Sequence, residues 1–182
     1  EEMEAVETLK GKGPHDLTDI SITLAANMLY LAQKGDAEHC KKLANEALYS
    51  GSALSKFVQM IKNQGGDTRV IDNFELLPSA HIKYEVKSQR EGYIFSMQTD
   101  RCGMVSVLLG AGREKKDSSL DLGAGLEIIK KTGDYINKGE TVARFYTSKP
   151  EVLNEAEALY LSALNISDKQ PPQQKLILER IE

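Results

Sequence analysis

Residues 108–146 read LLGAGREKKDSSLDLGAGLEIIKKTGDYINKGETVARFY, and this stretch decides the fold of the second half of the chain. Its first part contains four glycines that punctuate a predicted loop: Gly110, Gly112, Gly123 and Gly125. Two more, Gly133 and Gly139, bracket a predicted β-hairpin of the form G-D-x-x-x-K-G-E. Glycine adopts positive φ without a Cβ clash, so glycines at these points indicate tight turns.

Around this stretch, apolar and polar residues alternate with the period of half-buried strands, most clearly at Ile82, Tyr84 and Val86. We predict strands at 82–86, 93–95, 126–130, 141–146 and 175–181. We also predict two helices, one that Thr99 or Asp100 caps and that ends at Leu109, and one over 150–164. The second half is therefore expected to be an α+β unit.

The first 66 residues show helical periodicity instead. A helix predicted over 16–33, capped by Asp16 or Thr18, carries an apolar stripe made of Leu17, Ile20, Leu24, Met28 and Leu31. Asp36 is predicted to cap the next helix, and a third helix ends before Gly65-Gly66. A helical layer of this size needs a further partner to cover its remaining apolar face. A connector that ends at Pro78 predicts two domains, 1–75 and 76–182.

Composition excludes several classes of function. The 182 residues are 41% hydrophobic and 27% charged, which is ordinary for a globular protein. A net charge of −4 argues against nucleic acid and anionic membranes as partners, because the field of the chain repels phosphate. Cys40 and Cys102 lack metal-type spacing and are predicted to be free, buried thiols, and the three histidines are scattered.

Four segments, in this order, resemble the pyrimidine-nucleoside phosphorylases, a family that includes thymidine phosphorylase. They are EAVETLKGKGP at 4–14, SGSALSKFVQMIKNQGGD at 50–67, LLGAGR at 108–113 and GDYINKGE at 133–140. The resemblance implies a cytoplasmic nucleoside-salvage enzyme, usually a homodimer. Such an enzyme attacks C1′ of a pyrimidine nucleoside with phosphate and releases the free base and a pentose 1-phosphate.

The resemblance also implies which part of the enzyme this is. Residues 1–75 correspond to a helical segment of the central α/β domain. Residues 76–182 correspond to the α+β C-terminal domain, with a barrel-sandwich-like β-hairpin region. The family's catalytic and substrate-binding groups lie upstream of Glu1, and the chain opens inside a predicted helix. We therefore expect a C-terminal fragment with no catalytic or substrate-binding residues and no phosphorylase activity alone.

One binding residue is carried over from the resemblance. Bacterial members of the family hold a structural potassium ion near the domain hinge, and one ligand is a glutamate just before the E-T-L-K-G run. By position this residue is Glu4. A carboxylate oxygen suits such a hard cation. The resemblance places the other ligands upstream, so the ion is expected in the intact enzyme, and in this fragment Glu4 is expected to be a solvated helix residue. No other cofactor is expected.

Three further interpretations stay open at this point. Gly110 to Arg113 fits either a helix C-terminal cap or a contribution of Arg113 near the active-site cleft. The hairpin also resembles that of biotinyl and lipoyl carrier domains, with Lys115 or Lys116 as the modified lysine. The third alternative is a non-catalytic interaction module, with Tyr30, Tyr49 and Tyr160 as core or interface residues.

Overall fold

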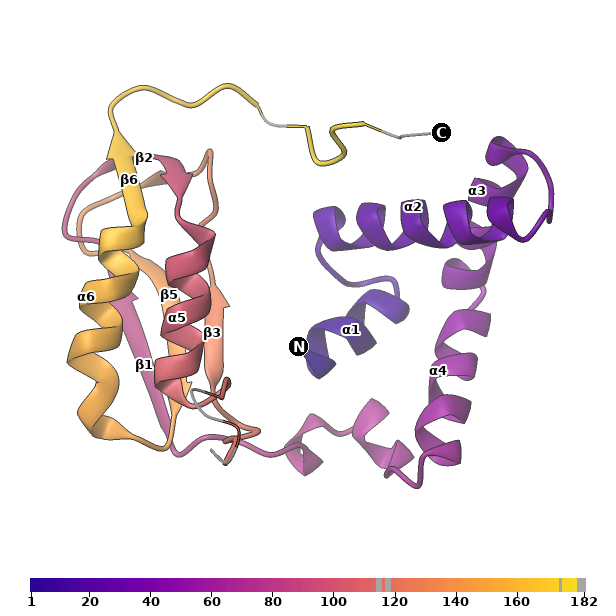
Figure 1. Cartoon of the computed structure of the whole chain (residues 1–182), viewed down its shortest axis with the longest axis horizontal. Coiled ribbons are helices and arrows are strands. Elements are labelled where there is room, and N and C mark those ends of the chain that lie inside the picture. Colours follow the sequence, from indigo (N-terminus) through magenta and orange to yellow (C-terminus); the bar gives the residue numbers. More distant parts are fainter. Residues whose placement is uncertain (114–115, 117–118, 174, 180–182) are drawn as a thin grey trace. The chain divides into compact units, whose positions relative to one another are not determined.

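The computed structural model in Figure 1 describes the whole chain except residues 114–115, 117–118, 174 and 180–182. The chain divides into two compact units, Glu1–Leu76 and Leu77–Gln174, and the segment from Lys175 is grouped with the first. In the described residues no helix is both long enough and apolar enough to cross a membrane.

Helices make up the first unit. They are α1 (Glu2–Leu9), α2 (His15–Leu31), α3 (Ala37–Tyr49) and α4 (Ser52–Asn63), followed by the short 3₁₀ helices η1 (Thr68–Ile71) and η2 (Phe74–Leu76). Asp36 caps α3 as predicted, because its carboxylate accepts the His39 N–H at 2.8 Å. The predicted cap of α2 is wrong. That helix begins after Pro14, so Asp16 lies inside its first turn.

The core of the first unit is small. Its one cluster of buried side chains consists, among the described residues, of Ile22 from α2 with Ala44 and Leu48 from α3. Four partly buried residues surround this cluster: Leu9, Ala25, Ala26 and Leu29. Helix α4 contributes no buried residue, since its apolar residues Leu54, Phe57, Val58 and Ile61 are only half-buried.

In its described residues, the second unit has two three-stranded antiparallel sheets and two α-helices, so the predicted α+β class is confirmed (Figure 1). One sheet has the order β1 (Ile82–Lys87), β5 (Thr141–Thr147), β3 (Gly125–Ile128). The other has the order β4 (Tyr135–Ile136), β2 (Gly92–Met97), β6 (Leu164–Ser167). Helix α5 (Thr99–Leu109) packs against α6 (Leu153–Ala163), which follows the 3₁₀ turn η3 (Pro150–Val152).

The second unit has a large core between its sheets and helices. Thirteen buried residues form one cluster in the described part of the chain. Phe145 from β5 and Tyr160 from α6 lie in it edge to face, with ring centroids 5.9 Å apart. Both cysteines are buried and free, as predicted. The exposed face of the first sheet is polar, and Arg144 there lies 3.4 Å from both Glu85 and Glu127 on the flanking strands.

The structure corrects three details of the second unit. Strands β3 and β5 do pair, but the Gly133–Gly139 segment between them is not their hairpin turn, since it carries β4 across to β2 in the other sheet. The predicted strand over 175–181 is absent from its described residues, 175–179, and β6 is the last strand among the residues that the structure describes. Helix α5 is preceded by Gln98, with no side-chain cap from Thr99 or Asp100.

Candidate functional site

The glycine-rich loop after α5 begins as a helix C-terminal cap. Gly110 adopts φ +109°, and its N–H and that of Ala111 donate to the carbonyls of Val107 and Ser106 at 3.0 Å. This arrangement satisfies the last carbonyls of the helix, which confirms the cap interpretation. The loop therefore follows the negative end of a helix dipole, where an anion is disfavoured.

The basic residues of this loop do not form a site in the described part of the chain. Arg113 and Lys116 are both exposed, and Lys116 lies in a turn. Lys115 lies outside the described residues. The segment that contains them connects helix α5 to strand β3, whereas a carrier-domain lysine sits on a turn between two strands. The structure therefore does not favour the carrier interpretation.

Asp121 fastens the second half of the loop. Its N–H donates to the Gly110 carbonyl, and its Oδ1 accepts the Gly123 N–H, both at 3.0 Å. The Ser148 side chain, followed by backbone N–H groups, lowers the pKa of the Asp121 carboxyl group. The sequence analysis did not single out Asp121, although an Asx-type turn at Asp-x-Gly is a recognisable signal.

Gly123 is required by packing rather than by ligand binding. A Cβ atom at this position would lie 2.3 Å from the Ala80 backbone nitrogen and 2.4 Å from the Ser79 carbonyl carbon. Only glycine therefore lets the loop lie against the segment that leads into β1. Gly125 differs, because no atom lies within 4 Å of its Cβ position.

Hydrogen bonds to strand β2 and to the β1–β2 connection explain the G-D-x-x-x-K-G-E pattern. The Gly133 N–H donates to the Ile94 carbonyl at 2.8 Å, and the Gly139 N–H donates to the Ser88 carbonyl at 2.7 Å. Ser88 returns a bond from its own N–H to the Glu140 carbonyl. The motif thus holds two connections together, which is a scaffold role.

The two acidic residues of the motif close its turns. Asp134 accepts the Lys131 N–H at 2.7 Å, and Glu140 accepts the Asn137 N–H at 2.8 Å. The Lys130 ammonium lies 2.7 Å from Glu140 and, with the Asn137 N–H, lowers the pKa of this carboxyl group to about 2. Both carboxylates therefore have a structural role in these turns.

Glu4 lies on α1 with an exposed side chain, and its carbonyl accepts the Thr8 hydroxyl at 2.7 Å. The described residues contain no group of three or more His, Cys, Asp or Glu side chains that could hold a metal ion. A cation needs several oxygen ligands, and Glu4 supplies one carboxylate here. The present residues thus fit a potassium site only in part, and the ion stays a prediction.

Lys10, in the E-T-L-K-G run, connects α1 to the end of the first unit. Its ammonium donates to the Ile71 carbonyl at 2.6 Å and lies 5.5 Å from the centre of the Phe74 ring. Asp72 and Glu7 lie within 4 Å of the same ammonium, at 3.9 and 3.8 Å. The sequence did not reveal this role, because the acceptor is a backbone carbonyl far along the chain.

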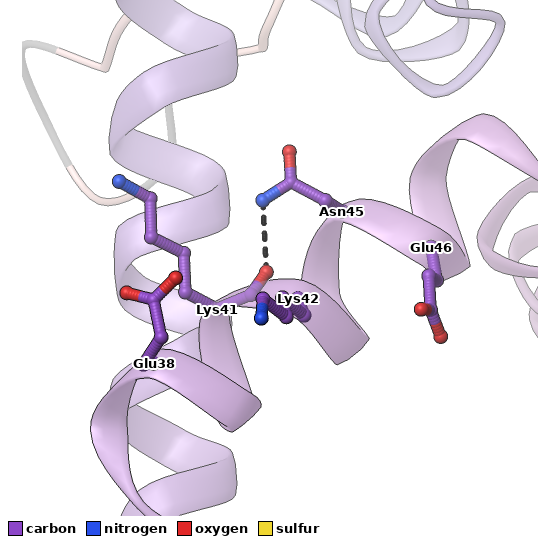
Figure 2. A pocket seen from close by; sticks show the side chains of 5 residues that line it. All are labelled: Glu38, Lys41, Lys42, Asn45 and Glu46. Carbon is purple, nitrogen blue, oxygen red and sulfur yellow. Dashed lines mark hydrogen bonds between the residues drawn. The ribbon is translucent and has the colours of Figure 1, made fainter.

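Two shallow hollows lie on the described surface. Figure 2 shows one whose lining side chains all project from α3: Glu38, Lys41, Lys42, Asn45 and Glu46. Asn45 donates to the Lys41 carbonyl at 2.8 Å, so its amide is engaged by its own helix. Side chains from one exposed helix face form a solvated charged surface. A second hollow lies beside β2 and β6, near Arg90 and Phe95.

Comparison with known proteins agrees with this scaffold. The sequence model of the pyrimidine nucleoside phosphorylase C-terminal domain matches residues 93–167, which run from β2 to the end of β6. Pyrimidine-nucleoside phosphorylases of Staphylococcus aureus strains USA300 and NCTC 8325 are each 40% identical to this chain over 166 residues. That alignment covers 91% of the chain and 38% of each relative.

The fold of the second unit is thus that of a C-terminal domain found in nucleoside-cleaving transferases. The chain belongs to the pyrimidine-nucleoside phosphorylase family. It spans less than two fifths of the length of the relatives it matches, at 38%.

Proposed function

We propose that this chain serves as the C-terminal part of an enzyme that cleaves pyrimidine nucleosides with inorganic phosphate. One observation carries the proposal. The identity of 40% to pyrimidine-nucleoside phosphorylases extends over 91% of the chain, so it includes the helical unit as well as the matched C-terminal domain. In the reaction, a phosphate oxygen forms a bond to C1′ while the bond from C1′ to the base nitrogen breaks. The base leaves with the bonding electrons and takes up a proton.

This chemistry sets requirements that help to assign the role of the chain. Phosphate needs several N–H, hydroxyl or ammonium donors, and the departing base needs a donor for its developing negative charge. The described loops that first invite such a role are occupied by scaffold contacts, as at Asp121 and Glu140. We propose that the catalytic groups lie in the part of the enzyme that this chain does not span, and that the chain alone is inactive.

Further properties of the intact enzyme belong to the same proposal. We place it in the cytoplasm as a homodimer, with 1–75 as the helical part of its central domain and 76–182 as the C-terminal domain. Glu4 would then supply one carboxylate to a potassium ion, completed by oxygen ligands from elsewhere in the enzyme. Comparing the thermal stability of the intact enzyme in KCl and in NaCl, before and after Glu4→Gln, tests this site. A stabilisation by KCl that Glu4→Gln leaves intact would remove Glu4 from the ligands.

The main experiment uses two proteins. One is the 182-residue chain alone, and the other is a chimera in which this chain replaces the matched C-terminal part of the S. aureus enzyme. Release of base from thymidine and uridine is measured with and without phosphate. We expect phosphate-dependent release by the chimera and none by the chain alone. Turnover by the chain alone, or a folded chimera without activity, would contradict the proposal.

A further inference from the structure

Helix α2 has apolar residues on two opposite sides. Its first apolar side packs on α3 and contributes Ile22, Ala25, Ala26 and Leu29 to the small core of the first unit. Successive residues of a helix are about 100° apart, so these four residues lie within about 100° of one another around the axis. This side accounts for the contact between α2 and α3.

The second side we call the α2 stripe, and it consists of Ile20, Leu24, Met28 and Leu31. These side chains fall within about 80° on the side opposite the α3 contact. Their exposed fractions are 37, 60, 71 and 79%. A surface helix of a globular protein is normally apolar on one side only, and a helix that is apolar all round is buried. The α2 stripe therefore has the composition of a covered surface and the exposure of an uncovered one.

The two units also differ in the size of their buried clusters. Thirteen described residues form the buried cluster of the second unit, whereas three form that of the first. Among its described residues, the first unit thus has four α-helices around a much smaller buried cluster. No charged residue belongs to the α2 stripe, so its complement is an apolar surface rather than a charged one.

We propose that the α2 stripe is the docking surface for the portion of the phosphorylase that this chain does not span. The inference rests on the proposed function, since it takes the relatives' additional polypeptide as the occupant. That polypeptide is large, because the alignment covers only 38% of each relative. It is also joined to this region in one chain, so its local concentration at the stripe is high without any affinity of its own. A second copy of the chain has neither advantage.

The test compares one substitution in two contexts. Leu24→Lys keeps a good helix former at an exposed position, so in the isolated chain the melting temperature should stay nearly unchanged. In the chimera with the S. aureus enzyme, the same lysine would be buried without a partner. We expect its melting temperature to fall by about 5 °C or more. Gln59→Lys, on the exposed side of α4, is the control. It removes an exposed hydrogen bond from the Lys56 ammonium, which contributes little at the surface, so it should be nearly neutral in both contexts.

Three outcomes would overturn the proposal. Equal tolerance of Leu24→Lys in both proteins would mean that the remainder of the enzyme does not cover the stripe. Equal destabilisation in both would mean that another part of this chain covers it. A dimer of the isolated chain that Leu24→Lys dissociates, seen by sedimentation, would make a second copy the occupant.

A second measurement tests the proposal if the chimera does not fold. The remaining part of the S. aureus enzyme is co-expressed as a separate chain, and its retention on the tagged 182-residue chain is measured. We expect the two chains to be retained together, and we expect Leu24→Lys, but not Gln59→Lys, to lower this retention at least about tenfold. No retention, or equal retention by both variants, would refute docking. The docking proposal and the proposed function can be distinguished. A folded but inactive chimera that Leu24→Lys still destabilises would refute the proposed function and support the docking surface.

Discussion

Replacing Gly123 by alanine tests whether the glycine-rich loop is held by packing. The added Cβ would lie 2.3 Å from the Ala80 nitrogen, and both groups belong to backbone. Ordinary contacts of a Cβ atom lie at about 3.4–4 Å, so the loop or the segment before β1 must move by about 1 Å. Backbone yields less readily than a flexible side chain. Overpacking of a tight site costs roughly 1–3 kcal/mol, and we expect the upper part of that range, about 2–3 kcal/mol.

Gly125→Ala is the matched control. It makes the same chemical change two residues away, in the same loop-to-strand segment, where nothing lies within 4 Å of the Cβ position. Thermal unfolding followed by circular dichroism should show a fall of roughly 10–20 °C for Gly123→Ala, if the second unit unfolds as one domain. Gly125→Ala should change the free energy of unfolding by less than about 0.5 kcal/mol. If the two variants are equally stable, the packing argument for Gly123 is wrong.

Two further predictions concern polar contacts. Lys10→Met removes the hydrogen bond to the Ile71 carbonyl and should destabilise the first unit by about 1–2 kcal/mol in urea unfolding. Lys12→Met, at an exposed position, is the control and should be neutral. Equal effects of the two substitutions would refute the stabilising role of Lys10. Glu140 has a pKa of about 2 in the folded chain against 4.5 as its ordinary value, so its contribution to stability is present above about pH 4.5 and is lost as the pH falls toward 2. Glu140→Gln should flatten the acid branch of the stability profile in that window. The effect should be larger at low salt than at high salt, because the pair with Lys130 is only half-buried, and an unchanged profile would refute it.

Elements with a complete local signal were predictable from the sequence. The alternation at Tyr84 and Val86 identified β1, since one side of the strand faces the core and the other faces water. Asp36 identified the start of α3, because the cap and the N–H it accepts are three residues apart. The family resemblance, based on four segments in order, was confirmed by the family match over residues 93–167 and by relatives that are 40% identical over 91% of the chain.

Elements whose identity depends on distant partners were not predictable. Tyr135 and Ile136 lie in what looks like a local hairpin, but their strand partners are Tyr93 and Gly92 in another sheet. The alternation at Leu176 and Leu178 suggested a strand, yet Leu178 is exposed and the described residues there pair with nothing in a sheet. A strand forms where a partner edge is present, and single-sequence periodicity does not contain that information.

The same distinction explains why the glycines and acidic residues that suggested a phosphate site make structural contacts instead. Glycines and acidic residues are the residue types of phosphate loops, but they are also the types that close turns. At Gly110 the loop caps a helix, at Gly123 it avoids a backbone clash, and at Glu140 it accepts a turn N–H. Each requirement is met inside the second unit, which has a complete core of its own. The first unit differs, because the apolar side chains of the α2 stripe are exposed in it. In our proposal, the dependence of this chain on a larger enzyme is therefore a property of its helices rather than of its glycine-rich loop.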